Sequence, residues 1–158
     1  MNGRWSNPPI LAGGALMTVA FFLPWAQASL FGFHNPIFSA ADLAEREPGW
    51  YLVLACGALT FLLGGAGLAA GLRRPQLQLY LNAGALLLSL VCAIFIWRVW
   101  SGLQGEGIAF SWIEGATAKD LALRLRHGIY VELAGCALAA LGGLLAVLGG
   151  RKESAAGK

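Results

Sequence analysis

The side chain best suited to chemistry in this sequence is an acid inside a long apolar stretch. Glu132 is the one acidic residue within such a stretch, and an acid inside a membrane is costly and usually has a function. It follows Gly128 by four residues and precedes Gly135 by three, so a helix turns all three to one face. Two interpretations fit: a proton or cation site, or a structural clamp on a polar partner near the outer surface. We favour the clamp.

Another apolar stretch carries three polar residues, of which Arg98 is the candidate partner for Glu132. Arg98 lies at a matching depth. At 100° per residue, however, it faces away from the side that carries Asn82 and Ser89. Arg98 is therefore either a partner of Glu132 or a side chain that snorkels to the outer interface. Together the four residues form the candidate polar site within the membrane.

Cysteines and histidines are the remaining candidate ligands. Cys56, Cys92 and Cys136 lie at similar depth in apolar stretches, but cysteine also behaves as a small apolar residue, which is the interpretation we prefer. His34 and His127 fall at the outer boundary without a further ligand cluster, and we interpret them as ordinary interfacial histidines rather than haem or metal ligands. The sequence thus predicts no metal site and no cofactor. It also has no nucleophile–base pair or nucleotide-binding loop, so we expect no enzyme.

Composition places these residues in a membrane protein. The chain is 58% hydrophobic and 12% charged, against about 25% charged residues in soluble domains. Four stretches are long enough to cross a hydrocarbon core of about 30 Å. The predicted spans are residues 8–30, 50–72, 76–100 and 128–150. The net charge of +3, without a basic run, gives no indication of nucleic-acid binding.

These spans predict an all-α membrane protein, a bundle of four transmembrane helices. Residues 1–150 are expected to form one transmembrane domain, and residues 151–158 a disordered tail. Pro24 is expected to kink the first span near its outer end, where Trp25 suits the interfacial aromatic belt. Ala26-Gln27-Ala28 resembles a signal-peptidase site. The apolar run before it is long for a signal peptide, so we interpret it as a span.

The two longer loops are predicted to hold short strands and capped helices. Residues 30–34 and 107–113 are the predicted strands. Ser39 and Thr117 each begin a capping-box pattern. The first predicts a helix over residues 40–47, and the second precedes an amphipathic helix over residues 121–126.

A gapless shift of 78 residues brings out an internal repeat. It pairs Ser39 with Thr117, Asp42 with Asp120, and Arg73-Arg74 with Arg151-Lys152. The sequence therefore predicts a tandem duplication of a two-helix unit. Parallel repeats occur in transporters and in plain duplicated scaffolds, and we favour the scaffold.

Glycines with heptad spacing are expected to be the helix-packing faces. Small residues let helices approach closely in lipid, either within one bundle or between subunits. The glycines are Gly57, Gly64 and Gly71 in the second span and Gly128, Gly135, Gly142 and Gly149 in the fourth.

Positive charges give the expected orientation. Arg73 and Arg74 fill a short turn, and Arg151 and Lys152 follow the last span directly. The positive-inside rule therefore predicts both termini in the cytoplasm and both long loops outside.

The pattern resembles a widespread group of small four-span bacterial membrane proteins of uncharacterised function. The likeness rests on Leu23-Pro24-Trp25 closing the first span, Arg73-Arg74 after the second, and the fourth-span pattern Gly128-Ile-Tyr130-Val-Glu-Leu133-Ala-Gly135. It implies a location in the bacterial inner membrane and no particular activity. Glu132 and Arg98 are not part of that pattern. The architecture is also similar to claudins in shape alone, because the first loop is shorter and lacks their W-GLW-C-C signature.

The leading functional prediction is an interaction or scaffold protein. It would be an accessory subunit of a larger membrane assembly, or a homo-oligomer packed through its glycine faces, with lipid and membrane subunits as partners. The alternative is a small transporter or channel using Glu132 with Asn82 and Ser89. A cofactor-binding membrane subunit ranks third.

Overall fold

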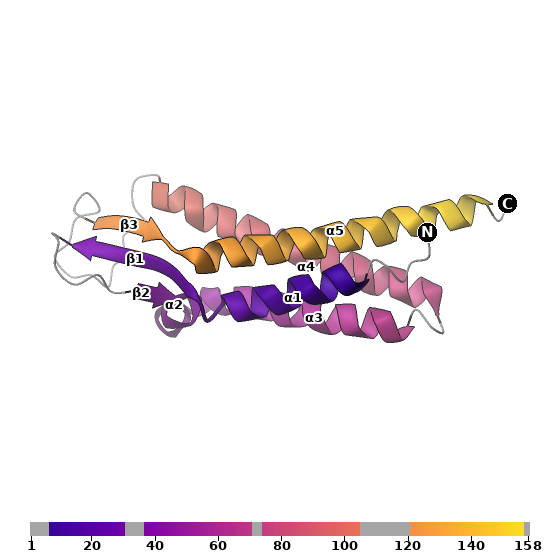
Figure 1. The fold of residues 1–158 in the computed structure, drawn as a ribbon, viewed down its shortest axis with the longest axis horizontal. Helices are drawn as coiled ribbons and strands as arrows, with labels where there is room; N and C mark the ends of the chain where they lie inside the picture. The colour runs from indigo at the N-terminus through magenta and orange to yellow at the C-terminus, as the bar shows by residue number, and fades with distance from the viewer. Residues whose placement is uncertain (1–6, 31–36, 71–73, 105–120, 157–158) are drawn as a thin grey trace.

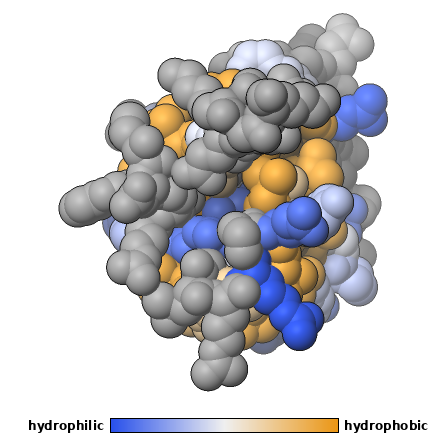
Figure 2. Space-filling view, turned by 90° about the vertical axis from the view of Figure 1, so that its right-hand side faces the viewer, coloured by the Kyte–Doolittle hydropathy of each residue, from blue (hydrophilic) through white to orange (hydrophobic). Residues whose placement is uncertain are grey.

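A computed structural model describes residues 7–30, 37–70, 74–104 and 121–156. The molecule is an elongated helical bundle with a small β-sheet at one end and both termini at the other (Figure 1). We call these the sheet end and the terminal end. Viewed from the terminal end, hydrophilic residues gather between hydrophobic ones (Figure 2).

The first helix is shorter than the sequence predicts. α1 (Asn7–Ala20) ends before Pro24, and β1 (Pro24–Leu30) begins there. A helical Pro24 would lack an N–H and its ring would collide with the carbonyl of Ala20. That carbonyl instead accepts the backbone N–H of Leu23 at 3.0 Å and the ring N–H of Trp25 at 2.7 Å. The prediction of a kinked span reaching residue 30 is therefore wrong, because Pro24 ends the helix rather than bending it.

Three strands form the sheet in the order β2-β1-β3, with both neighbours antiparallel to β1. β2 (Ile37–Ser39) pairs Phe38 with Ala26, and β3 (Leu121–Leu125) pairs Leu125 with the same alanine. Short strands thus occur at this end of the bundle, as the sequence predicts, although most residues of the two predicted strands are not among those described. Leu30 closes β1, and the rest of the predicted strand at 30–34 lies outside the described residues, as do residues 107–113 and the capping box at Thr117.

β3 corrects the amphipathic helix predicted over residues 121–126. The segment Leu-Ala-Leu-Arg-Leu also alternates with a period of two, which suits a strand. Its backbone groups pair with β1, and this pairing decides between the two patterns. The repeat relates residues 43–46 to residues 121–124, which are helix in one copy and strand in the other. At this place the structure does not support the duplication.

The first capped helix is confirmed. α2 (Ala40–Arg46) begins after Ser39, whose side chain accepts the backbone N–H of Asp42 at 3.1 Å. The Asp42 carboxylate accepts the backbone N–H of Ser39 at 2.7 Å, which completes the capping box. A 3-10 turn, η2 (Pro48–Trp50), follows where Pro48 and Gly49 were expected to break the helix.

Three long helices make this a multi-pass membrane protein. They are α3 (Tyr51–Ala70), α4 (Pro75–Gln104) and α5 (His127–Ala156). Among the described residues, three helices are apolar enough over 23 residues to cross a membrane. α1 has 14 residues, about 21 Å. α5 runs to Ala156, so the prediction of a disordered tail from residue 151 is wrong over residues 151–156.

The helices close into a ring in which each packs against two neighbours. α1 lies between α3 and α5, and α4 contacts α3 and α5 on the other side. Neighbours run antiparallel, as the short connection between α3 and α4 requires. At the sheet end the interior is filled by an apolar cluster that includes Met17, Phe21, Trp25, Val53 and Ile96. Trp50 packs edge-on against Trp25, with ring centroids 5.7 Å apart.

Candidate buried site at the sheet end

Glu132 lies inside the bundle, on the first turns of α5. Its side chain is fully buried. One carboxylate oxygen, Oε1, accepts the thiol S–H of Cys92 on α4 at 3.2 Å. The other oxygen, Oε2, has no hydrogen-bond partner in the described part of the chain. A buried carboxylate with one unsatisfied oxygen is costly, so this residue requires an explanation beyond packing.

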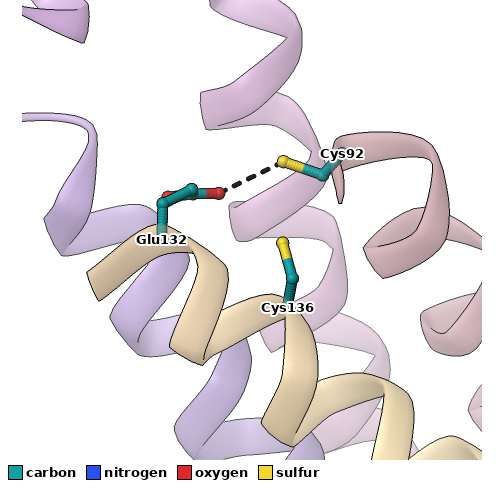
Figure 3. A group of neighbouring side chains, drawn as sticks. All are labelled: Cys92, Glu132 and Cys136. Atoms are coloured by element: carbon teal, nitrogen blue, oxygen red, sulfur yellow. Dashed lines mark hydrogen bonds between the residues drawn. The ribbon is translucent and has the colours of Figure 1, made fainter. Parts of the chain in front are cut away.

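Cys136 joins Glu132 and Cys92 in one cluster. It lies one helical turn after Glu132, so both side chains leave α5 on the same face. Figure 3 shows the two sulfur atoms and the carboxylate directed into the space between α4 and α5. The two sulfur atoms and a carboxylate oxygen lie within 4.8 Å of one another, and all three residues are buried. Cys56 of a third helix, α3, belongs to the same buried core cluster as Cys92 and Cys136.

The predicted site residues Asn82 and Ser89 are also buried but do not join this cluster. Both lie on the inward face of α4, 1% exposed. Ser89 Oγ donates to the carbonyl of Leu86 at 2.8 Å. Asn82 lies against Gly67 of α3 and is ten residues from Cys92, about 15 Å along the helix. The structure thus places Glu132, Asn82 and Ser89 in one interior at different depths.

Arg98 does not belong to the buried group. Its side chain is exposed, on the side of α4 away from the bundle. This position matches the snorkelling interpretation and not the ion pair with Glu132. His127 begins α5 and is exposed, and His34 lies outside the described residues.

Several glycines lie where two helices meet closely. A Cβ on Gly135 would lie 2.9 Å from the carbonyl oxygen of Gly13, and one on Gly57 would lie 2.9 Å from the backbone nitrogen of Thr18. These contacts join α1 to α5 and to α3 within the chain. The other predicted packing glycines differ in their surroundings. Gly64 approaches α1, Gly128 approaches Trp25, and Gly142 is buried. A Cβ on Gly149 would have open space, and Gly71 lies outside the described residues.

Sequence reasoning missed other polar residues in the interior. Asn7, Thr60 and Gln78 are buried as well. Asn7 Oδ1 and Thr60 Oγ1 have no hydrogen-bond partner among the described residues. A signal was present, because Gln78, Asn82, Ser89 and Cys92 follow one another on α4 at steps of four, seven and three, the spacing of one helix face.

The cysteine cluster was also missed. Each cysteine taken alone is most simply a small apolar residue. The informative pattern was the spacing of four between Glu132 and Cys136, which turns an acid and a thiol to the same face. The contribution of Cys92 could not be read from the sequence, because it depends on how α4 is rotated against α5.

These observations define a class: a mostly helical, multi-pass integral membrane protein with polar side chains enclosed at several depths of its bundle. Comparison with models of known protein families, with curated proteins and with solved structures finds no match to this chain.

Proposed function

We propose that this chain is a non-enzymatic interaction protein of the bacterial inner membrane. It crosses the membrane four times with both termini in the cytoplasm. It serves as an accessory subunit of a larger assembly, or as a homo-oligomer. Support comes from the three long apolar helices, from α1 packed in the same ring, and from the cationic helix ends at the terminal end.

One observation carries this proposal: the helices meet backbone to backbone along α1. A Cβ on Gly13 would lie 2.6 Å from the carbonyl oxygen of Gly135, and one on Gly14 would overlap the backbone of Phe61. Contacts this close leave no space for a permeation path between these helices. The work of the protein is then done at its outer surfaces. Because glycines of both predicted faces contact α1, partners bind elsewhere than at those contacts.

The test is the native mass of the protein after gentle detergent extraction from its source membrane. Release with unlike proteins at a fixed ratio supports the accessory subunit, and those proteins identify the process. A closed set of identical copies supports the homo-oligomer. A single chain carrying only lipid, over a range of mild detergents, contradicts the proposal.

A small transporter or channel is the second candidate, and one observation favours it. Glu132, Asn82 and Ser89 all face the interior of the bundle, as residues along a route would. Transport would require the helices to separate, since the glycine contacts close the bundle at α1.

Flux into liposomes distinguishes the second candidate from the first. A transporter would carry protons or small cations, and Glu132→Gln would reduce that flux at least about tenfold, because a buried acid is the group that exchanges a proton or cation. Arg98→Gln, an exposed change on a neighbouring helix, is the control and should leave the flux unchanged. Absence of flux in the unaltered protein ends this candidate.

A cofactor-binding membrane subunit is the third candidate. The enclosed thiols and carboxyl at the sheet end are its only support among the described residues. A purified protein without an absorption band beyond that of its aromatic residues would exclude a coloured cofactor.

A further inference from the structure

The cluster of Cys92, Glu132 and Cys136 has the donor atoms of a metal site. Thiolate sulfur and carboxylate oxygen are both zinc ligands, at about 2.3 Å and 2.0–2.2 Å from the ion. Tetrahedral ligands at those distances lie about 3.3–3.8 Å apart. Cys92 Sγ and Glu132 Oε1 are already 3.2 Å apart, and all three ligand atoms lie within 4.8 Å. Side-chain rotations that move these three atoms by about 1 Å therefore bring them to the spacing of metal ligands.

The carboxylate supplies a second, independent observation. Glu132 is fully buried, and its Oε2 has no hydrogen-bond partner in the described part of the chain. Arg98, the cation that the sequence offers at this depth, is exposed on the other side of α4. A bound cation would give Oε2 of Glu132 a partner. The sulfur atoms of Cys92 and Cys136 then determine which kind of cation binds. Soft thiolates favour zinc-like ions over calcium or magnesium.

We infer that Cys92, Cys136 and Glu132 bind one divalent thiophilic metal ion, of which Zn²⁺ is the expected example. A four-coordinate shell needs one further ligand, and Cys56 of α3 is another thiol in the same buried core cluster. The site would tie α4 to α5 at the sheet end. This inference does not depend on the proposed function.

Binding of the ion requires the two cysteines as thiolates and Glu132 as a carboxylate. The two thiol protons therefore leave for water when the ion binds, and the carboxylate oxygens stay free to bind it.

The walls of the site are suited to excluding water. The buried side chains of Phe21, Trp25, Val53 and Ile96 belong to the same core cluster as the three cysteines. An apolar shell of this kind strengthens metal–ligand interactions and slows exchange of the ion. We therefore expect the ion to survive purification in mild detergent and to be removed slowly by chelators.

The test uses the full-length protein, purified under reducing, anaerobic conditions. Elemental analysis should find about one zinc ion per chain. After removal of zinc, Co²⁺ should bind at the same ratio and give the visible bands of a thiolate-bound ion, and Zn²⁺ should abolish those bands. Cys92→Ser and Cys136→Ser should each weaken Co²⁺ binding at least about 100-fold, since even indirect partners of a metal site cost 10–100-fold. Glu132→Gln should weaken it as well.

Ser89→Ala is the matched control. It removes a buried polar group from the same face of α4, three residues from Cys92, without touching the cluster. Its Co²⁺ affinity should equal that of the unaltered protein. If Ser89→Ala loses Co²⁺ binding as the cysteine variants do, the losses reflect damage to the bundle and the inference fails.

A second measurement needs no variant. In the unaltered protein, zinc should protect Cys92 and Cys136 from alkylation, as read by peptide mass spectrometry, and a chelator should remove that protection. Equal alkylation with and without zinc overturns the inference. Monovalent copper bound at one ion per chain in place of a divalent ion overturns it as well.

Discussion

The capping box of α2 shows how few atoms define a helix end. The Asp42 carboxylate accepts the backbone N–H of Ser39 at 2.7 Å and the Ser39 hydroxyl at the same distance. The backbone bond, and then the hydroxyl bond, lower the pKa of Asp42 from its ordinary value. Both bonds favour the ionised acid. The cap therefore couples the stability of α2 to pH.

We expect this coupling to appear as acid weakening of α2. Because the folded-state pKa is lowered, the contribution of Asp42 is complete above its ordinary pKa of 3.8. It is lost as the pH falls through the lower folded value. Amide hydrogen exchange of α2, corrected for intrinsic rates, should show less protection as the pH drops below that range. Asp42→Asn should remove the pH dependence, and Ser39→Ala should cost about 1 kcal/mol of α2 protection at neutral pH. Unchanged exchange in Ser39→Ala would contradict the role of the cap.

For individual residues, the sequence predicted those features that the spacing of residues along a helix determines. The cap at Ser39 and the shared face of Glu132 and Gly135 both follow from helical geometry, and the structure has both. The partner of Glu132 does not follow from it. The choice between Arg98 and Cys92 depends on the rotation of α4 about its axis, which is set by contacts with two other helices.

Among the elements, α1 approaches its neighbours closely through two of its glycines. The backbones of α1 and α3 touch at Gly14 and Phe61, so any side chain at Gly14 forces the helices apart. Gly65 of α3, by contrast, has open space where a Cβ would be placed. Substitutions at Gly14 and Gly65 therefore distinguish the packing role of glycine from the effect of its low helix propensity.

We expect Gly14→Ala to destabilise the protein and Gly65→Ala to have little effect or to stabilise it slightly. Overpacking against a fixed backbone typically costs 1–3 kcal/mol. Replacing an uncrowded helical glycine by alanine instead gains up to about 1 kcal/mol. Thermal unfolding of both variants in the same detergent, followed by circular dichroism, gives the comparison. Equal midpoints would show that α1 and α3 do not pack through Gly14.

The element boundaries were predictable only where a local rule acted alone. Pro48 and Gly49 break the chain as their residue types require. At Pro24 two local rules competed, a kink within a membrane helix and an outright stop, and pairing of β1 with two strands favoured the stop. β3 was likewise decided by its partner, since its sequence suits either a strand or an amphipathic helix.

On the scale of the whole molecule, the bundle has two different ends. The sheet and α2 cover one end, and both termini and the turn between α3 and α4 lie at the other (Figure 1). In the proposed four-span topology both termini lie on the same side of the membrane. The cationic turn and the charged end of α5 favour the cytoplasm for that side.

Reporter fusions should give this topology. Fluorescent protein fused after Lys158 should fluoresce, and alkaline phosphatase fused after Arg74 should be inactive, because the proposed topology places both in the cytoplasm. Alkaline phosphatase fused after Glu47, at the sheet end, should be active. Activity at Arg74 together with inactivity at Glu47 would invert the orientation.

The shortness of α1 has a consequence for the lipid around it. With 14 residues, or about 21 Å, α1 falls about 9 Å short of an average hydrocarbon core. The paired strand that continues it has its backbone hydrogen bonds satisfied by β2 and β3, so it can border the headgroups without exposing unsatisfied groups. With α1 as the proposed fourth span, we expect the bilayer next to it to thin, and the cost of this hydrophobic mismatch to grow with acyl-chain length. In nanodiscs, the unfolding temperature should therefore fall as the acyl chains lengthen, and we expect the protein to partition toward thinner regions of a mixed membrane.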